Sequence, residues 1–266
     1  MARVIAVQEV LVSVVIPALN EADNLPHVLP RIPQWVQEVI LVDGYSIDDT
    51  VEVAKRLMPS IRIIWQDGAG KGAALRSGVK AATGDIVIML DADGSTDPSE
   101  IPAFVGALLA GADLVKGSRF VQGGGTADMP PLRQWGNWCF VLLANVMFGT
   151  RFSDITYGYR GAWRHCLGQL ALEIDGWENE TVGNIRAART GLRVAEVPSF
   201  EYRRIGGEAK LQTFPAGWVI LKGMLAEGVR AVRFSGVRRW RSPEIATAVA
   251  STTSTPAPDR AMVLTR

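Results

Sequence analysis

The chain has 266 residues, of which 28 are Lys or Arg and 27 are Asp or Glu, so its formal net charge is only +1. A chain of this length can bury a large core, and its balanced charge gives no global field that would favour nucleic acid. Two cysteines, Cys139 and Cys166, are too few for a disulfide framework or a cysteine zinc site, and their apolar surroundings predict buried thiols. We find no secretory pattern and no run of about 20 apolar residues, so we expect a cytoplasmic protein without a membrane span.

The first half alternates short apolar runs with helical patterns, which predicts an α/β fold with a mostly parallel central sheet flanked by helices. The first expected strand, residues 12–16, precedes a helical stretch over residues 25–32 that prolines bend or shorten. The elements expected next are strands over 39–42, 61–65 and 85–90, which alternate with helices over 51–57 and 72–82. A further helix begins with Asp97 as its cap, Pro98 in its first position and Glu100 reaching back to the cap.

The second half continues the pattern and then loses it. Its expected elements are a strand over 112–116, helices over 132–149 and 178–190, a strand over 193–202 and an amphipathic helix over 213–234. From about residue 242 the chain is rich in Ala, Ser, Thr and Pro and lacks periodicity, which predicts disorder. We therefore expect one α/β domain over 1–212, an amphipathic helical segment over 213–241 and a disordered tail over 242–266.

Polar segments follow four of the expected strands, at Asn20-Glu21, Asp43-Gly44, Asp67-Gly68 and Asp91-Ala92-Asp93. In open sheets of this kind, ligands bind outside the carboxyl ends of the strands. We therefore expect the functional site at this edge of the sheet.

Asp91 and Asp93 are the strongest candidates for a metal site. Residues two apart in an extended segment project to the same side, so both carboxylates can face one cation. Mg²⁺ or Mn²⁺ prefers such oxygen ligands and fills its other positions with water and substrate phosphates. The ion would stabilise the charge that grows on a leaving diphosphate. The alternative is that one Asp caps the next helix while the other is merely exposed, but the position directly after a buried strand favours the metal.

Two further side chains at this edge have alternative interpretations. Asp43 can accept hydrogen bonds from a base or a ribose hydroxyl, or it is simply the turn residue of an Asp-Gly pair. Lys71 lies in a glycine-rich segment, but no Ser or Thr follows it and the glycine spacing is wrong for a nucleoside triphosphatase loop. The lysine can still offset phosphate charge, and its glycines let the backbone approach a ligand closely.

A basic group gathers later in the chain, and we expect two or three of its members to contact phosphate, although each alone reads as a surface charge. Its members are Arg119, Arg133, Arg160, Arg203, Arg204 and Lys210. Two acids near the start of an expected helix, Glu178 and Glu180, either stabilise that helix or include a general base that deprotonates an acceptor hydroxyl.

Taken in order, these motifs resemble those of the inverting family 2 glycosyltransferases and, more narrowly, of the dolichyl- or polyprenyl-phosphate sugar synthases. The resemblance runs from about residue 12 to residue 225. Its motifs are Pro17-Ala18-Leu19-Asn20-Glu21, Val42-Asp43-Gly44 with Ser46 and Asp49-Thr50, Gly70-Lys71-Gly72, Asp91-Ala92-Asp93-Gly94 and Gly117-Ser118-Arg119-Phe120. It implies the GT-A fold, a UDP- or GDP-sugar donor, Mg²⁺ or Mn²⁺, and inversion at the anomeric carbon.

The resemblance and the residue patterns described above together give expected roles for individual residues. The expected donor-binding positions are Pro17, Leu19, Asn20, Glu21, Asp43, Asp67, Lys71, Asp91, Ala92, Asp93, Arg203 and Lys210, with Asp91 and Asp93 holding the metal. The expected catalytic positions are Asp93, Arg119, Arg133, Glu178 and Glu180, where the two arginines would meet the acceptor phosphate. The chain departs from the synthases after its second strand, where Val42-Asp43-Gly44-Tyr45-Ser46 replaces the usual Asp-Asp-Gly-Ser, so donor base and sugar stay open.

A phosphate acceptor needs no strong general base, because it is already an anion that has only to be aligned and screened. The aromatic stretch 132–149, with Trp135, Trp138, Phe140 and Phe148, and the helix around Trp218 would then rest at the inner face of a membrane, or both are packing helices. A homodimer is compatible with the sequence. Two other functions stay open: transfer to a soluble hydroxyl acceptor with Glu178 or Glu180 as base, and non-catalytic binding of a nucleotide sugar.

Overall fold

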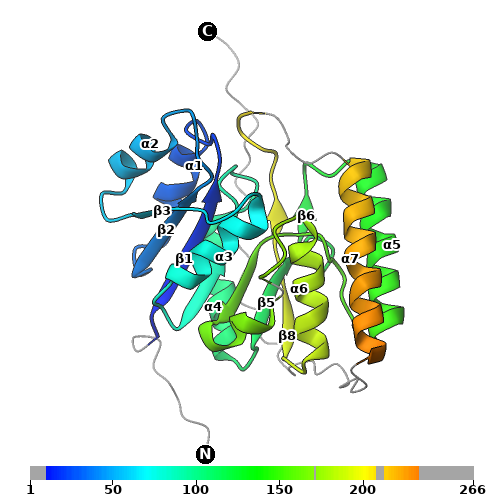
Figure 1. Cartoon of the computed structure of the whole chain (residues 1–266). Helices are drawn as coiled ribbons and strands as arrows, with labels where there is room; N and C mark the ends of the chain where they lie inside the picture. The colour runs from blue at the N-terminus through cyan, green and yellow to red at the C-terminus, as the bar shows by residue number, and fades with distance from the viewer. Residues whose placement is uncertain (1–9, 171, 208–212, 234–266) are drawn as a thin grey trace, which may run out of the picture.

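The computed structural model describes residues 10–170, 172–207 and 213–233. Its main sheet has seven strands in the order β3-β2-β1-β4-β7-β5-β8 (Figure 1). These strands are β1 (Val12–Ala18), β2 (Glu38–Asp43), β3 (Arg62–Trp65), β4 (Ile86–Met89), β5 (Leu114–Ser118), β7 (Arg160–Trp163) and β8 (Val194–Pro198). A two-stranded parallel pair is formed by β6 (Gly125–Thr126) and β9 (Phe200–Glu201).

The predicted parallel α/β sheet is confirmed, with one strand that the sequence did not reveal. Strand β7 runs antiparallel between β4 and β5, pairing Met89 with Arg160 and Lys116 with Arg160. Its four residues contain Gly161, where a Cβ atom would lie only 2.6 Å from the Ile88 side chain. The sequence of this strand therefore lacks the run of apolar residues that predicts a buried strand, because close packing at this point requires a glycine.

Helices cover both faces of the sheet, and successive strand residues alternate between the two cores, with Val14 in one and Val15 in the other. One face is covered by α1 (Leu25–Val28), α2 (Thr50–Leu57) and α4 (Ile101–Leu109), and the other by α3 (Lys71–Ala81), α5 (Pro131–Phe148), α6 (Glu178–Arg189) and α7 (Thr213–Arg233). Three short 3₁₀ helices, η2 (Leu29–Arg31), η3 (Pro98–Glu100) and η4 (Arg164–Gln169), complete the described elements.

Two local predictions had different outcomes at the start of η3. Asp97 caps it as expected, since its carboxylate accepts a hydrogen bond from the backbone N–H of Ser99. The prediction that Glu100 reaches back to this cap is wrong. Its carboxylate instead accepts hydrogen bonds from the Ser199 hydroxyl and the Phe200 N–H, because the β8–β9 connection packs over η3.

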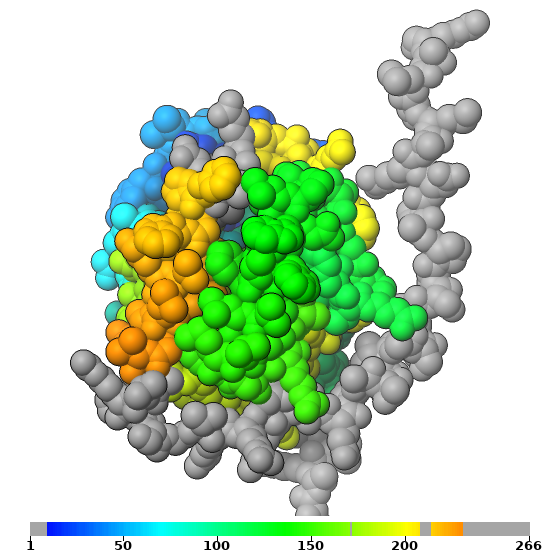
Figure 2. Space-filling view, turned by 90° about the vertical axis from the view of Figure 1, so that its right-hand side faces the viewer, coloured from blue at the N-terminus to red at the C-terminus, as the bar shows by residue number. Residues whose placement is uncertain are grey.

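The predicted helical segment over 213–241 is seen as α7 as far as residue 233, and it packs against α6 and α5. The remainder of that segment lies outside the described residues. Figure 2 shows α7 (orange) and α5 (green) side by side on one face of the molecule. None of the helices in the described ranges is long and apolar enough to span a membrane. The predicted tail, residues 242–266, lies outside the described residues.

Candidate active site

A cleft of about 900 Å³ opens at the carboxyl edge of the sheet, where the sequence places the site. One part of its wall is polar and comes from the segments after β1 and β4, including Glu21, Asp91 and Asp93. Another part is apolar and comes from α5 and α7, including Trp135 and Trp218. The cleft therefore combines a charged surface with an aromatic one.

Asp91 and Asp93 both line this cleft, in the loop that follows β4. Asp93 accepts hydrogen bonds from the Ser95 N–H and hydroxyl through Oδ1, and from Arg204 at 3.1 Å through Oδ2. Burial raises the pKa of Asp91 to about 6, against the opposing effect of Lys71. Mg²⁺ or Mn²⁺ is commonly bound by one or two protein carboxylates, while phosphates and water fill its other coordination positions. Within the described ranges no group of three or more His, Cys, Asp or Glu could hold a metal ion by itself.

Lys71, the first residue of α3, joins two carboxylates in the cleft. Its Nζ atom lies 2.7 Å from Asp91 Oδ1 and 2.6 Å from Glu180 Oε1. Burial disfavours the charged form, but the two carboxylates outweigh burial and raise the pKa of Lys71. The ammonium group is therefore charged and lies where it can meet an anionic ligand.

The glycines beside Lys71 serve the protein's own packing. A Cβ atom at Gly72 would lie 2.0 Å from the Ile174 carbonyl oxygen, and the Gly72 N–H donates to the Asp175 carbonyl at 2.9 Å. Gly70 has a φ of 92° and also lies against Asp175. Gly72 therefore admits the segment before α6, whereas Gly70 also lines the cleft, so close approach of a ligand to its backbone stays a prediction.

The structure distinguishes the two acids of α6. Glu180 lines the cleft and contacts Lys71, whereas Glu178 lies beside Gly223 of α7 and Val182, outside the cleft. Residues two apart on a helix point about 200° away from each other, so both cannot face one site. Glu178 is therefore not a candidate base, and Glu180 is the only one of the two that can act in the cleft.

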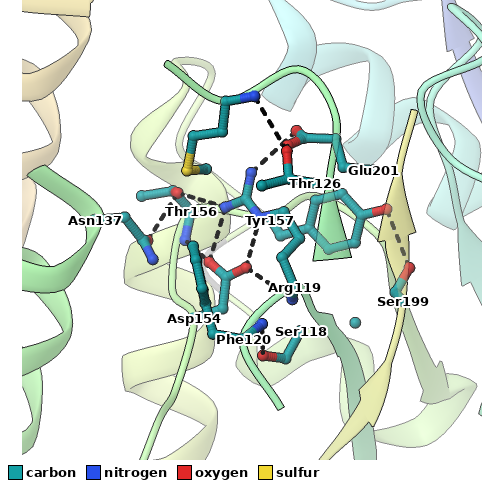
Figure 3. A network of polar contacts seen from close by, with 12 residues as sticks. Ser118, Arg119, Phe120, Thr126, Asn137, Asp154, Thr156, Tyr157, Ser199 and Glu201 are labelled. Carbon is teal, nitrogen blue, oxygen red and sulfur yellow. Dashed lines mark hydrogen bonds and ion pairs between the residues drawn. The ribbon is translucent and has the colours of Figure 1, made fainter. Parts of the chain in front are cut away.

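Arg119 lies on the cleft wall but is already engaged by the protein (Figure 3). It is 5% exposed, and its Nε and Nη2 atoms donate to the two oxygens of Asp154 at 2.7 and 2.9 Å. Nη2 also donates to Thr156 and Nη1 to Glu201, both at 3.0 Å. The planar fork that was expected to meet an acceptor phosphate is therefore occupied by Asp154. Neither Asp154 nor Glu201 was singled out from the sequence, because nothing in a linear pattern links them to Arg119.

The residues expected to hold the nucleoside surround the exits of β1 and β2. Pro17, Leu19 and Glu21 line the cleft, and Ala92 lies beside them in its wall. Asp43 is 2% exposed, and its Oδ1 atom has no hydrogen-bond partner among the described residues. Asp43 is not among the residues that line the cleft, so a hydrogen bond from a base N–H or a ribose hydroxyl to this oxygen stays a prediction.

Asn20 and Asp67 have local roles instead. The Asn20 side chain accepts from the Ile47 N–H at 2.8 Å, and its positive φ of 53° shapes the turn. Asp67 is exposed and does not line the cleft, while its backbone N–H and carbonyl are bonded to Ser77 and Arg76 of α3. Neither side chain is placed to contact a ligand in the cleft.

Among the basic residues, the structure selects Arg204 over Arg203. Arg203 is exposed and donates to the Ala127 carbonyl, whereas Arg204 lines the cleft and donates to Glu21 at 2.6 Å as well as to Asp93. Arg133 lines the cleft from the first turn of α5. Arg160 is fully buried on β7, where it donates to Asn179. Lys210 lies outside the described residues.

The aromatic residues of α5 and α7 divide in the same way. Trp135, Phe140 and Trp218 line the cleft, while Phe148 packs in the core and Trp138 points outward with 60% of its surface exposed. Both cysteines are free thiols, with Cys166 buried as expected and Cys139 only half-buried.

Residues 13–170 match the model of a protein family described as glycosyl transferase family 2. The chain belongs to this family. This glycosyltransferase is 34% identical over 238 residues to an undecaprenyl-phosphate mannosyltransferase of Micrococcus luteus, with 82% of this chain and 96% of that protein covered. It is 34% identical over 217 residues to a dolichyl-phosphate hexose transferase of Haloferax volcanii, with 80% and 92% covered.

The fold of the glycosyltransferase is also found in solved structures. Glucosyl-3-phosphoglycerate synthase from Mycobacterium tuberculosis, in complex with Mn²⁺, uridine-diphosphate and glucosyl-3-phosphoglycerate, matches with a TM-score of 0.65 and 26% identity over 83% of this chain and 81% of that one. The predicted GT-A fold is therefore confirmed, and with it the prediction that this chain is an enzyme of sugar transfer.

Proposed function

We propose that this glycosyltransferase inverts the anomeric carbon and moves a hexose from a UDP- or GDP-sugar to a polyprenyl or dolichyl phosphate. The observation that carries the proposal is the division of one cleft into a charged wall, with Asp91, Asp93 and Lys71, and an aromatic wall, with Trp135 and Trp218. A nucleoside diphosphate suits the first wall, and a prenyl chain suits the second. The relatives named for undecaprenyl and dolichyl phosphate support this acceptor.

Asp91 and Asp93 would hold Mg²⁺ or Mn²⁺ together with the donor diphosphate, as the solved Mn²⁺ and uridine-diphosphate complex of a similar protein suggests. The ion would supply positive charge to the leaving nucleoside diphosphate. Lys71 and Arg204 reach the same carboxylates and would share their charge with the phosphates. Asp43 would accept a hydrogen bond from the nucleoside through its unpaired Oδ1 atom.

In the transfer step, an oxygen of the acceptor phosphate forms a bond to the anomeric carbon while the bond from that carbon to the diphosphate breaks. The electron pair of the broken bond leaves with the nucleoside diphosphate, and the single displacement inverts the configuration. Arg133, on the cleft wall, would screen the repulsion between the two phosphate groups. Arg119 would act behind it by holding Asp154, Thr156 and Glu201 in place.

A lipid-linked acceptor would lie in a membrane. The proposal therefore includes peripheral attachment of the enzyme to the inner face of that membrane. A homodimer stays a prediction, since the described structure contains a single chain.

A soluble hydroxyl acceptor is the second candidate. It is favoured by the position of Glu180, whose carboxylate lines the cleft and could take a proton from an attacking hydroxyl. A phosphate acceptor needs no such base, so the role of Glu180 separates the two candidates. Non-catalytic binding of a nucleotide sugar is disfavoured by the acidic pair in the cleft.

The test is a panel of UDP- and GDP-sugars with Mn²⁺ or Mg²⁺, assayed with and without a short polyprenyl phosphate. Asp93→Ala is assayed beside Glu52→Ala, a control at an exposed acid of α2. We expect nucleotide release that depends on the prenyl phosphate, is lost in Asp93→Ala and is kept in Glu52→Ala. Donor binding without transfer to prenyl phosphate would reject this acceptor and direct the search to soluble hydroxyls. Absence of donor binding would reject the enzyme assignment.

A further inference from the structure

Helices α5 and α7 carry exposed apolar side chains on a face that the rest of the described chain leaves uncovered. Figure 2 looks onto this face, where the two helices lie side by side. The two helices run side by side, with Gly217 next to Phe140 and Gly228 next to Met147. The outward apolar residues recur at helical spacing on each helix and are each at least 48% exposed. They are Leu132, Trp135, Trp138, Leu142 and Val146 on α5, and Phe214, Trp218, Leu225 and Val229 on α7, and we call this set the α5/α7 face.

The charges of these two helices are of one sign on the outside. α5 contains no Asp or Glu, and the only acid of α7, Glu227, is buried and paired with Arg186 and Arg189. Lys222 and Arg230 are exposed on α7. The exposed Glu173, in the segment before α6, lies 3.9 Å from Arg230 at the edge of this surface. The exposed charges that the two helices themselves carry are basic, and aromatic and aliphatic side chains beside basic ones are complementary to a bilayer with anionic headgroups.

The α5/α7 face is continuous with the cleft. Leu132 and Trp135 of α5, and Phe214 and Trp218 of α7, are exposed on this face and also line the cleft. The cleft therefore opens between the first turns of the two helices, onto the apolar surface itself. A ligand with an apolar tail could enter the cleft from a bilayer without its tail crossing water.

A second copy of the chain fits this surface less well. A two-fold interface would set the same patch against itself, and α5 and α7 offer no exposed acid of their own to pair with its basic side chains, so that only Glu173 beside Arg230 could do so. A lipid surface supplies the missing negative charge.

We propose that the α5/α7 face docks on a phospholipid bilayer and sets the mouth of the cleft against the lipid. The evidence for docking is the set of exposed residues alone. The entry of a prenyl phosphate at the mouth of the cleft rests in addition on the proposed function. The indole rings of the α5/α7 face lie at the headgroup level, where Trp is favoured.

The test measures co-sedimentation of the full chain with vesicles of phosphatidylcholine, with and without phosphatidylglycerol. The variant Trp138→Gln/Val146→Ser/Val229→Ser changes three residues of the face that do not line the cleft. The control is Trp65→Gln on β3, because Trp65 is 58% exposed and Trp138 60%. We expect the triple variant to lose about tenfold or more in vesicle affinity, and Trp65→Gln to bind like the wild type. Lys222→Gln/Arg230→Gln should weaken binding only to the vesicles that contain phosphatidylglycerol.

Activity separates this proposal from the assignment of the acceptor. With a short, water-soluble prenyl phosphate the triple variant should turn over like the wild type, and with a long-chain acceptor in vesicles its rate should fall in parallel with its binding. Equal vesicle binding by wild type and triple variant would overturn the docking face. So would a wild-type dimer that the triple variant converts to a monomer. Face-dependent vesicle binding without transfer to any prenyl phosphate would reject the acceptor and retain the docking surface.

Discussion

Asp91, in the loop after β4, and Glu180, near the start of α6, are held together by one ammonium group. Lys71 Nζ lies 2.7 Å from the first carboxylate and 2.6 Å from the second. Arg204 joins Glu21 to Asp93 in the same manner. Asp91 is thus neutralised by Lys71, and Asp93 by Arg204. A donor diphosphate would attract the same two basic side chains. We therefore expect the metal ion and the donor to bind more tightly together than either binds alone.

Lys71→Met should bind Mn²⁺ alone about tenfold more tightly than the wild type, because a competing cation is removed from Asp91. Its affinity for a nucleotide-sugar donor should fall, since a partner for the diphosphate is lost. Free Mn²⁺ measured by electron paramagnetic resonance gives the first value and calorimetry the second. Lys80→Met, an exposed lysine of the same helix, serves as control. Weaker Mn²⁺ binding by Lys71→Met would contradict competition between the two cations.

Glu180→Gln should lower kcat more than Glu178→Gln if the acceptor is a hydroxyl, because only Glu180 faces the cleft. The size of the fall in kcat for Glu180→Gln distinguishes the two classes of acceptor. A hydroxyl acceptor that needs a general base predicts a fall of about 10²- to 10⁴-fold, whereas a phosphate acceptor predicts about tenfold or less. Steady-state kinetics with each acceptor class measure both values. With a hydroxyl acceptor, equal losses in the two variants would contradict the assignment of Glu180 as the base.

Arg119→Met should lower the free energy of unfolding by about 3–5 kcal/mol, because it leaves the fully buried Asp154 without its partner. Arg119→Met/Asp154→Leu should cost less than the sum of the two single changes. Urea unfolding measures all three. The control is Arg193→Met, which removes an exposed bidentate ion pair with Asp113. This change should lower the free energy of unfolding by less than about 1 kcal/mol. Additive costs would mean that Arg119 and Asp154 do not stabilise the fold as a pair.

Glu100 should make stability depend on pH. Burial raises the pKa of Glu100 to about 7 from an ordinary value of 4.5, although Ser199 and Phe200 donate to it. A raised carboxyl pKa contributes stability in full below pH 4.5, and this contribution is lost as the pH rises through 7. Relative to Glu100→Gln, the wild type should therefore lose about 3 kcal/mol of unfolding free energy across this window.

Urea unfolding of both proteins at several pH values tests this prediction, with Glu52→Gln as the control at an exposed acid. A constant difference between wild type and Glu100→Gln at every pH would rule out the raised pKa.

The location of the site followed from the sequence because parallel strands that exit at one edge of a sheet bring their following residues together. Asp91, Asp93, Glu21 and Lys71 meet in the cleft although none is near all the others along the chain. The aromatic stretch 132–149 also formed the expected helix, because its apolar periodicity is local. Strand β7 was not predicted because it forms by pairing with β4 and β5, and its own residues show no strand pattern.

The sequence by itself determined the family, the GT-A fold and the acidic pair, since these depend on motifs and periodicities that are written along the chain. Only the tertiary structure decided which member of a neighbouring pair lines the cleft, namely Glu180 rather than Glu178 and Arg204 rather than Arg203. It also decided that Arg119 is held by Asp154. The physical reason is that the direction of a side chain and the partner that satisfies its charge are set by packing between segments far apart in the chain.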